Sequence, residues 1–418
     1  MYRIAGFACV VALFAFAGCG GGGSSTSGGG NAAAAPAAKP TGNVTWCIGK
    51  DTTGAFSTMV SSYNKANPKS HAKLLELPTS ADQQRTQIIQ RLRAKSSECD
   101  VIGMDVTWTA EFAGQNWLKD VSDLVNKRQN DFIPSTVKTA QFDGKTYAVP
   151  FNTNAGFLYY RKDKVKSPPT TWQQVYNDAK SNGGIVYQGS QYEGLTVDYL
   201  EMLYSAGGKI VDSSGKKLDL DKNKATQVLS FMANGIKDGA APKANVTYME
   251  EESRRAFESG KPAFMRNWPY AYALDKKAPI GSKFAVAPLP GWQGGHPASV
   301  LGGYNLGISA YSKNPAGAAA FINFVTQPAQ QLVMGVKAAL PPVLTSVYDD
   351  PKLKQAMPFA SELRKAVQQG QARPVSPVYP QITEAIYKNV YAALQGQTSP
   401  QAAVNKMGSQ VQNALKTF

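Results

Sequence analysis

From residue 43 onward, short apolar runs alternate with segments whose apolar residues recur every three or four positions. The clearest strand-sized runs are 44–49, 71–77 and 100–104. Between them, residues 53–67 have helical spacing, and Ser80-Ala-Asp-Gln83 has the pattern of a capping box that opens a second helix. This alternation predicts an α/β fold in which helices flank mostly parallel strands.

The pattern also suggests that the chain passes more than once between two lobes. Strand-like runs at 145–151 and 157–160 are joined by a polar break at 152–156 that is too short for a helix. Similar signals return at 284–291 and 339–342, which predicts three hinge crossovers. About 375 residues remain after the N-terminal segments, more than one hydrophobic core usually serves. We therefore expect one lobe from 43–154 with 287–346, and another from 155–286 with 347–418.

The C-terminal region predicts helices. Residues 381–394 place apolar side chains on one face, Gly396 ends that segment, and Ser399-Pro400 opens a last helix. Residues 219–223 begin like a calcium loop but lack its later glycine and glutamate. They are better interpreted as a polar helix entry.

The N-terminus has the features of an export signal. Arg3 precedes an apolar stretch, which ends at Ala17-Gly18-Cys19 and is too short to span a bilayer. Residues 1–18 resemble a bacterial lipoprotein signal peptide, with Cys19 as the acylated residue. Residues 19–42, rich in Gly, Ser, Ala and Pro, then form a flexible tether. An ordinary secretory signal with a chance cysteine is the alternative.

Such a signal would place the protein at the outer face of the cytoplasmic membrane, where disulfides form. Cys9 leaves with the signal and Cys19 is committed to lipid, so Cys47 and Cys99 remain as a pair. Both lie at strand-like runs that would be neighbours in a doubly wound sheet. We expect a disulfide between them, with two buried free thiols as the alternative.

Charge and motifs exclude several classes of function. The net charge of +15 comes from dispersed lysines, without the basic, aromatic-interleaved stripe that nucleic-acid binding requires. His71 and His296 are the only histidines, and neither has metal-ligand spacing or supports a catalytic triad. Phosphate-loop and nucleophile-elbow motifs are absent. We therefore expect no metal, no cofactor, no nucleic-acid partner and no covalent chemistry.

Polar and aromatic residues instead gather at strand ends and crossovers. They are Asp105, Asn152, Asn154, Trp268, Tyr270, Tyr304 and Arg373. Flat apolar rings combined with hydrogen-bonding groups suit a sugar, whose hydroxyls lie at its edge and whose C–H groups lie on its face. The carboxyl ends of strands in open α/β sheets are also where ligands bind.

Five motifs in order carry a family resemblance. They are 100–112 (DVIGMDVTWTAEF), 144–150 (GKTYAVP), 155–163 (AGFLYYRKD), 264–270 (FMRNWPY) and 301–308 (LGGYNLGI). The chain resembles the family 1 extracellular solute-binding proteins of ABC sugar importers from residue 43 to its end. Its closest branch is the trehalose/maltose-binding lipoproteins. This resemblance implies a two-lobed periplasmic-binding-protein fold of class II.

The resemblance also implies a sugar-binding role for individual residues. Those that match family positions are Arg85, Asp105, Asn154, Glu250, Trp268, Tyr270, Gly302, Tyr304 and Arg373, where Glu250 is preferred to its two acidic neighbours by spacing alone. Tyr304 replaces the usual Trp, and Asn152 stands where some relatives carry Tyr. After the first strand, Asp51 or Thr52 is a further candidate contact.

The resulting hypothesis is a monomeric lipoprotein that closes by a hinge on an α-linked disaccharide, of the trehalose or maltose type, and delivers it to an ABC permease. A secreted glycosidase using Asp105 and Glu250 is the main alternative. A binder of polyamines would need more acids, and an iron binder would need Tyr/His clusters. Neither pattern is present.

Overall fold

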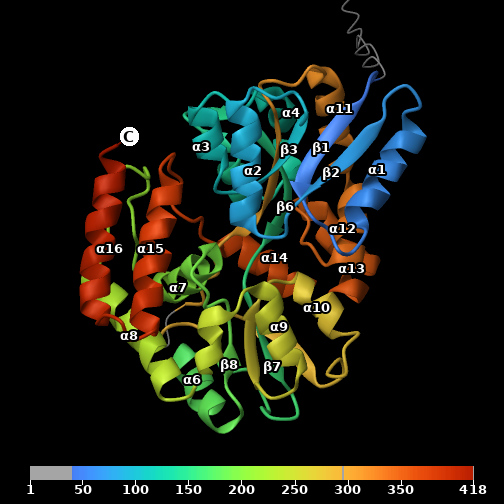
Figure 1. Ribbon diagram of the computed structural model, residues 1–418. Coiled ribbons are helices and arrows are strands. Elements are labelled where there is room, and N and C mark those ends of the chain that lie inside the picture. The colour runs from blue at the N-terminus through green and yellow to red at the C-terminus, as the bar shows by residue number, and fades with distance from the viewer. Residues whose placement is uncertain (1–39, 294–295, 418) are drawn as a thin grey trace, which may run out of the picture. The chain divides into compact units, whose positions relative to one another are not determined.

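A computed structural model describes residues 40–293 and 296–417 (Figure 1). The predicted signal peptide and the predicted acylation site, Cys19, lie outside the described residues. Within the described ranges, no helix is both long and apolar enough to cross a membrane.

A five-stranded sheet holds the first half of the candidate site. Its strands lie in the order β2 (Ala72–Leu77), β1 (Val44–Gly49), β3 (Val101–Asp105), β11 (Gly302–Ile308) and β6 (Ala148–Asn154). β1 runs parallel to β2 and β3, whereas β11 is antiparallel to both β3 and β6. The continuous apolar run of β1 produces a strand that is buried on both faces, whereas β2 at the edge of the sheet has exposed residues.

A second, four-stranded sheet has the order β10 (Phe284–Pro288), β7 (Phe157–Arg161), β9 (Phe264–Asn267) and β8 (Ile185–Val186). β7 is antiparallel to β10 and β9, and β8 is parallel to β9. Both sheets are therefore mixed, which corrects the expectation of mostly parallel strands. Apolar runs reveal that a strand is buried but not its direction, and strands that return from the other sheet enter antiparallel.

The chain passes from one sheet to the other after β6 and again after β10. β6 extends to Asn154, so the polar break before β7 shortens to Ala155 and Gly156. β10 of the smaller sheet leads to β11 of the larger one. Residues 339–342 form no strand; Pro342 makes only an isolated bridge to Asn152. The lobe boundaries given above stay a prediction.

Helices surround both sheets (Figure 1). Those near the larger sheet include α1 (Ala55–Ala66), α2 (Ala81–Arg93), α11 (Pro315–Val325), α12 (Pro328–Ala338) and α13 (Pro351–Ala356). α15 (Tyr379–Leu394) and α16 (Pro400–Leu415) pack against α7 (Glu193–Ser205) and α8 (Lys222–Lys237). The others are α3 (Thr109–Gly114), α4 (Ser122–Asn126), α5 (Pro134–Thr139), α6 (Trp172–Ser181), α9 (Glu250–Glu258), α10 (Tyr270–Asp275) and α14 (Ala360–Gln369). The shorter elements are β4 (Gln141–Phe142), β5 (Lys145–Thr146), η1 (Gln129–Asp131), η2 (Lys243–Thr247) and η3 (Thr345–Asp349).

Several local signals act as predicted. The Ser399 hydroxyl caps α16 by accepting from the Ala402 amide, and Asp221 caps α8, which confirms the polar helix entry. Gly396 follows α15 with φ 71°. Ser80 is the N-cap residue of α2, but its side chain makes no capping hydrogen bond, so the capping box is not formed.

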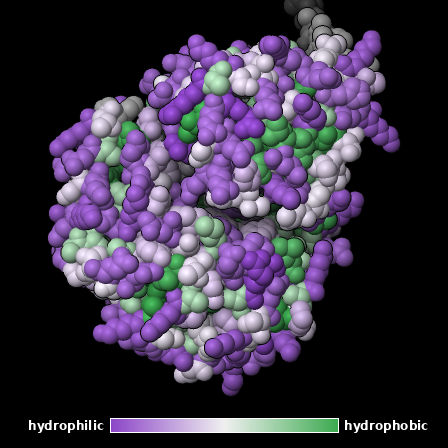
Figure 2. All heavy atoms as spheres, viewed as in Figure 1, coloured by the Kyte–Doolittle hydropathy of each residue, from purple (hydrophilic) through white to green (hydrophobic). Residues whose placement is uncertain are grey.

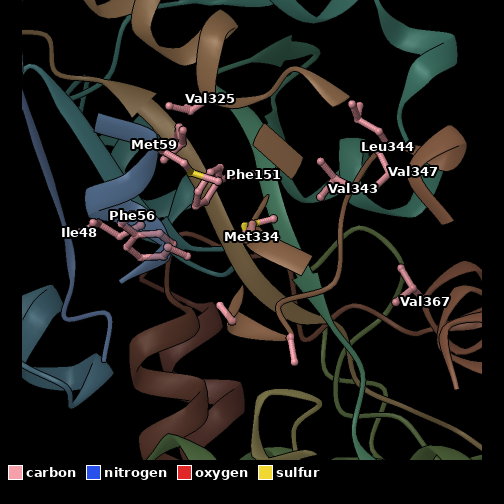
Figure 3. Close-up of a cluster of buried hydrophobic side chains, with 14 of the residues drawn as sticks. Ile48, Phe56, Met59, Phe151, Val325, Met334, Val343, Leu344, Val347 and Val367 are labelled. Atoms are coloured by element: carbon pink, nitrogen blue, oxygen red, sulfur yellow. The ribbon is translucent and has the colours of Figure 1, made fainter. Parts of the chain in front are cut away.

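Aromatic packing fills the core beneath β1. The Trp46 ring lies 5.0 Å from Phe56, 5.5 Å from Phe151 and 5.4 Å from Phe321, centroid to centroid. Figure 3 shows Phe56 and Phe151 within this cluster of buried side chains.

The predicted disulfide between Cys47 and Cys99 is confirmed. It links β1 to the residues before β3 across a separation of 52 residues. Closing such a loop contributes about 4 kcal/mol in the chain-entropy account. The disulfide thus links β1 covalently to the segment that leads into β3.

Candidate functional site

Strand register brings five predicted residues to one edge of the larger sheet. Tyr304 lies opposite both Asp105 and Asn152, and Gly302 lies opposite Asn154. The Asn152 amide oxygen accepts a 3.1 Å hydrogen bond from the Tyr304 backbone amide. The parallel strands of this sheet place their carboxyl ends, including Asp105, at that edge, as the sequence predicts.

An arginine joins this edge to the helices around the smaller sheet. Arg373 donates from Nη2 to Asp105 Oδ1 at 2.8 Å and from Nη1 to Glu193 Oε1 at 2.8 Å. Glu193 begins α7, and its carboxylate also accepts from Thr383 at 2.6 Å and from the Tyr379 hydroxyl. We call Asp105, Arg373 and Glu193 the junction cluster.

Burial and charge act together on the junction cluster. Burial raises the pKa of Glu193, and the Asp105 charge adds to that effect while the Arg373 charge opposes it. Burial opposes the charge on Arg373, but the carboxylates of Asp105 and Glu193 more than offset it and raise the pKa of Arg373. The guanidinium therefore stays charged and holds its two partners.

Trp268 supplies an aromatic surface from the end of a strand of the smaller sheet. It follows β9 directly and is half-buried. Its backbone oxygen accepts from the Tyr159 hydroxyl at 2.7 Å, and the Arg266 guanidinium lies 4.1 Å from its ring centroid. A Cβ on Gly302 would lie 3.2 Å from the ring atoms Cη2 and Cζ3. The structure thus brings Trp268 against the strand that carries Tyr304.

Tyr270 and Glu250 lie near this surface but are bonded locally. The Tyr270 hydroxyl donates to Glu251 Oε1 at 2.7 Å, and the Tyr192 hydroxyl donates to Glu250 Oε2 at 2.8 Å. Burial raises the pKa of Tyr304, and the charges of Asp105 and Glu250 raise it further. Glu250 is therefore within electrostatic range of the same edge.

Three buried polar atoms at this edge have no hydrogen-bond partner among the described residues. They are Asn152 Nδ2, Asn154 Oδ1 and Arg373 Nε. Buried polar atoms are normally hydrogen-bonded, because each unpaired group costs about 1–3 kcal/mol. The side-chain hydrogen bonds that Asp105 accepts within the described ranges all end on Oδ1, which leaves Oδ2 unpaired there. Two donors and two acceptors at this edge are thus left without a hydrogen-bond partner among the described residues.

Two predicted contacts are occupied by local partners. Asp51 accepts from the amides of Thr53 at 2.8 Å and Phe56 at 2.9 Å, so its carboxylate caps the start of α1. Arg85 forms a two-pronged ion pair with Glu111. Whether Asp51 or Arg85 reaches a ligand stays a prediction.

Sequence reasoning missed the residues that hold the site residues in place. Glu193 binds Arg373, and Gln84 Oε1 accepts from the Tyr304 hydroxyl at 2.9 Å. Gln84 is buried in α2, although a glutamine on an otherwise polar helix looks solvent-exposed in sequence. Over the described residues no group of three or more His, Cys, Asp or Glu side chains is placed to hold a metal.

Comparison with known proteins identifies consistent relatives. The profile of the bacterial extracellular solute-binding protein family matches residues 49–332. A probable ABC transporter-binding protein of Deinococcus radiodurans is 38% identical over 362 residues, which cover 81% of this chain and 85% of the relative.

Solved structures agree with this assignment. Maltose-bound T. maritima MalE3 is 34% identical and superposes with a TM-score of 0.83, covering 89% of this chain and 99% of that one. The GacH receptor of Streptomyces glaucescens, with a TM-score of 0.82 but 24% identity over 90% of this chain and 99% of its own, shares the fold. These likenesses confirm the predicted two-lobed α/β fold.

Proposed function

We propose, because the chain belongs to the bacterial extracellular solute-binding protein family, that it captures an α-linked disaccharide outside the cytoplasm and delivers it to an ABC permease. One observation carries the sugar assignment. Unpaired buried donors and acceptors converge on a half-buried indole and a carboxylate with a free oxygen. A sugar needs this combination of hydrogen bonds at its edge and an aromatic surface at its face.

The likeness to maltose-bound T. maritima MalE3 favours a maltose-type ligand, with trehalose as the second candidate. In this proposal Asp105 and Arg373 bind hydroxyl groups and Trp268 stacks on one ring. Asn152, Asn154, Gly302 and Tyr304 line the larger sheet's side, while Tyr270 and Glu250 line the other. Asp51 and Arg85 would need to leave their local partners to take part.

Hinge closure is the proposed mechanism. Arg373 already joins Asp105 of the larger sheet to Glu193 of α7, so a ligand that binds both sides would stabilise the closed state. The lobes would follow the predicted boundaries, with one from 43–154 and 287–346 and the other from 155–286 and 347–418. The protein would act as a monomer, anchored through Cys19 and the tether of residues 19–42 after removal of residues 1–18.

Hydrolysis of the sugar is the alternative, with Asp105 and Glu250 as the two carboxyl groups. A glycosidase needs one of them to hold a proton as a general acid. Asp105 is instead paired with Arg373, and Glu250 accepts a hydrogen bond from Tyr192, so both carboxyl groups are engaged by side chains of this chain. The relative from Deinococcus radiodurans is also named as a probable ABC transporter-binding protein.

The test is calorimetric titration of the purified protein with maltose, trehalose and glucose, followed by analysis of the recovered sugar. We expect saturable binding of a disaccharide that is recovered intact. Trp268→Ala should remove binding, whereas Trp292→Ala should retain it, because the Trp292 ring packs against Phe231 away from the site. Released glucose would support the hydrolase, and no binding of any of these sugars would contradict the proposed ligand class.

A further inference from the structure

We propose that Arg266 is a positioning residue for the sugar-binding indole. In this proposal, which rests on the proposed function, Arg266 covers one face of Trp268 and fixes the plane of the ring. Only the opposite face then remains for a pyranose, so the indole stacks on a single sugar ring.

The guanidinium of Arg266 is itself held in a fixed plane. Its Nε and Nη2 donate to the two carboxylate oxygens of Glu201 at 2.7 and 2.6 Å. Its Nη1 donates to Gln188 Oε1 at 2.8 Å, and the residue is 1% exposed. A two-pronged bond to one carboxylate plus a third bond leaves a planar group little freedom to rotate.

A second carboxylate strengthens this restraint. Asp198 Oδ1 lies 3.0 Å from Arg266 Nε. Asp198 Oδ2 accepts from the backbone amide of Gln188 at 2.8 Å. We call Arg266, Glu201 and Asp198 the platform cluster. Because all three are buried, displacing the arginine would leave carboxylates without a counter-charge, which is costly.

The Trp268 ring is confined on more than one side. Arg266 lies over the ring at 4.1 Å from its centroid, within the range of a cation–π contact. Gly302 meets the edge formed by Cη2 and Cζ3, where even a methyl group would lie at 3.2 Å. The Trp268 amide donates to Asn267 Oδ1 at 2.8 Å, which fixes the backbone. The ring nevertheless remains half-buried rather than enclosed.

The platform cluster also touches the connection between the sheets. A Cβ on Gly156 would collide with the Glu201 carboxylate and the Arg266 guanidinium. Gly156 lies between β6 and β7, so the same ion cluster that supports the indole packs on the crossover backbone. This contact places the ring at a set position relative to the strands that carry Asp105 and Tyr304.

The experiment compares Arg266→Lys with Arg255→Lys, a matched change at an exposed arginine of α9. Lysine keeps the charge but cannot reproduce the planar, two-pronged bond. Two quantities are measured: maltose affinity by calorimetry, and acrylamide quenching of Trp268, obtained as the difference between each protein and its Trp268→Phe counterpart. We expect Arg266→Lys to weaken maltose binding at least tenfold and to increase Trp268 quenching, and Arg255→Lys to change neither.

A maltose affinity within twofold of the original, with unchanged Trp268 quenching, would overturn the inference. If the unchanged protein does not bind maltose, the proposed function fails, but the quenching comparison still decides whether Arg266 fixes the ring. If Arg266→Lys does not fold, Glu201→Gln weakens the two-pronged bond that holds the Arg266 guanidinium and so tests the same restraint on the ring. We expect at least tenfold weaker binding and altered Trp268 quenching, and no change in either would contradict the inference.

Discussion

The junction cluster and the platform cluster each place an arginine between two carboxylates, yet they differ in how far their carboxylates are exposed to solvent. In the platform cluster the side chains of Arg266 and Glu201 are 2% and 1% exposed. In the junction cluster Asp105 is 14% exposed, and Arg373 Nε has no partner in the part of the chain that the structure describes. Asp198 Oδ1 of the platform cluster is also without a hydrogen-bond partner among the described residues, so pairing alone does not separate the clusters. A cluster whose carboxylates are partly exposed can accept a ligand, whereas a fully buried one can only support its neighbours.

The surroundings of the two clusters agree with a ligand-binding role for the junction cluster and a supporting role for the platform cluster. The junction cluster lies beside the buried orphan atoms of Asn152 and Asn154, at the edge of the larger sheet. The platform cluster lies beneath Trp268 and against Gly156. Figure 2 shows mostly hydrophilic residues over α9, α15 and α16, so the outer surface there resembles ordinary solvated helix faces. The distinguishing chemistry is therefore inside, between the two clusters.

Replacing the arginine of each cluster should give the largest effects on the free energy of unfolding, and these effects should differ between the two clusters. Arg266→Met leaves two buried carboxylates without a counter-charge, so we expect a loss of about 3–5 kcal/mol in the free energy of unfolding. Arg373→Met should cost less, about 1–3 kcal/mol, because Asp105 can be partly hydrated. Urea unfolding monitored by circular dichroism measures both. A larger loss for Arg373→Met would reverse the comparison.

Neutralising Asp105 should affect binding more than folding. Asp105→Asn removes a charged acceptor from the junction cluster, so maltose affinity should fall about 10- to 100-fold, as hydrogen bonds to charged groups predict. Stability should change by about 1 kcal/mol, because the amide oxygen that replaces Oδ1 can still accept from Arg373, which keeps Glu193 as its counter-charge. Asp123→Asn, an exposed carboxylate on α4, is the control. Equal affinities for both variants would remove Asp105 from the site.

Asp275 gives a pH-dependent contrast with both clusters. This carboxyl group is buried without a hydrogen-bond partner among the described residues, and burial, with the charge of Glu258, raises the pKa of Asp275 to about 8. The folded state therefore holds a proton that the unfolded state loses near pH 4. Stability is fully present below that pH and falls as pH rises through about 8.

Asp275→Asn should remove this pH dependence, because the amide stays neutral. We expect the variant to be more stable than the original at pH 9 by about 1–3 kcal/mol, and nearly equal to it at pH 5. Thermal unfolding at the two pH values measures the difference. A constant difference between the proteins from pH 5 to pH 9 would show that Asp275 does not titrate in this range.

Tyr304→Phe should have the smallest effect. The change leaves Gln84 Oε1 without the hydroxyl that donates to it, so we expect a loss of about 0.5–1.5 kcal/mol in stability. Gln84→Leu tests the same bond from its other end, and the double variant should cost less than the two single changes combined. Strict additivity in urea unfolding would show that the two side chains do not stabilise each other.

Sequence reasoning located the strand ends better than the interactions that support them. Asp105 could be placed because a buried apolar run ends there, and the Cys47–Cys99 disulfide followed from two cysteines at neighbouring strands. Glu193 could not be found, because it meets Arg373 across 180 positions in the chain. No local pattern encodes such a contact.

Strand direction and local pairing were also beyond the sequence. β11 is buried along nearly its whole length, like the parallel strand β1, but it enters the larger sheet antiparallel. The family resemblance implies a sugar-binding role for Arg85, yet Glu111 lies close enough to pair with it. Both outcomes depend on which segments meet in space, and spacing along the chain does not determine that.

The most direct test of the central claim is a crystal structure of the purified protein with maltose. The account predicts one glucose ring on the exposed face of Trp268, with hydroxyl groups bonded to Asp105 and Arg373 and to the orphan atoms of Asn152 and Asn154. Maltose bound elsewhere, with these atoms unchanged, would contradict the assignment of this edge as the sugar site.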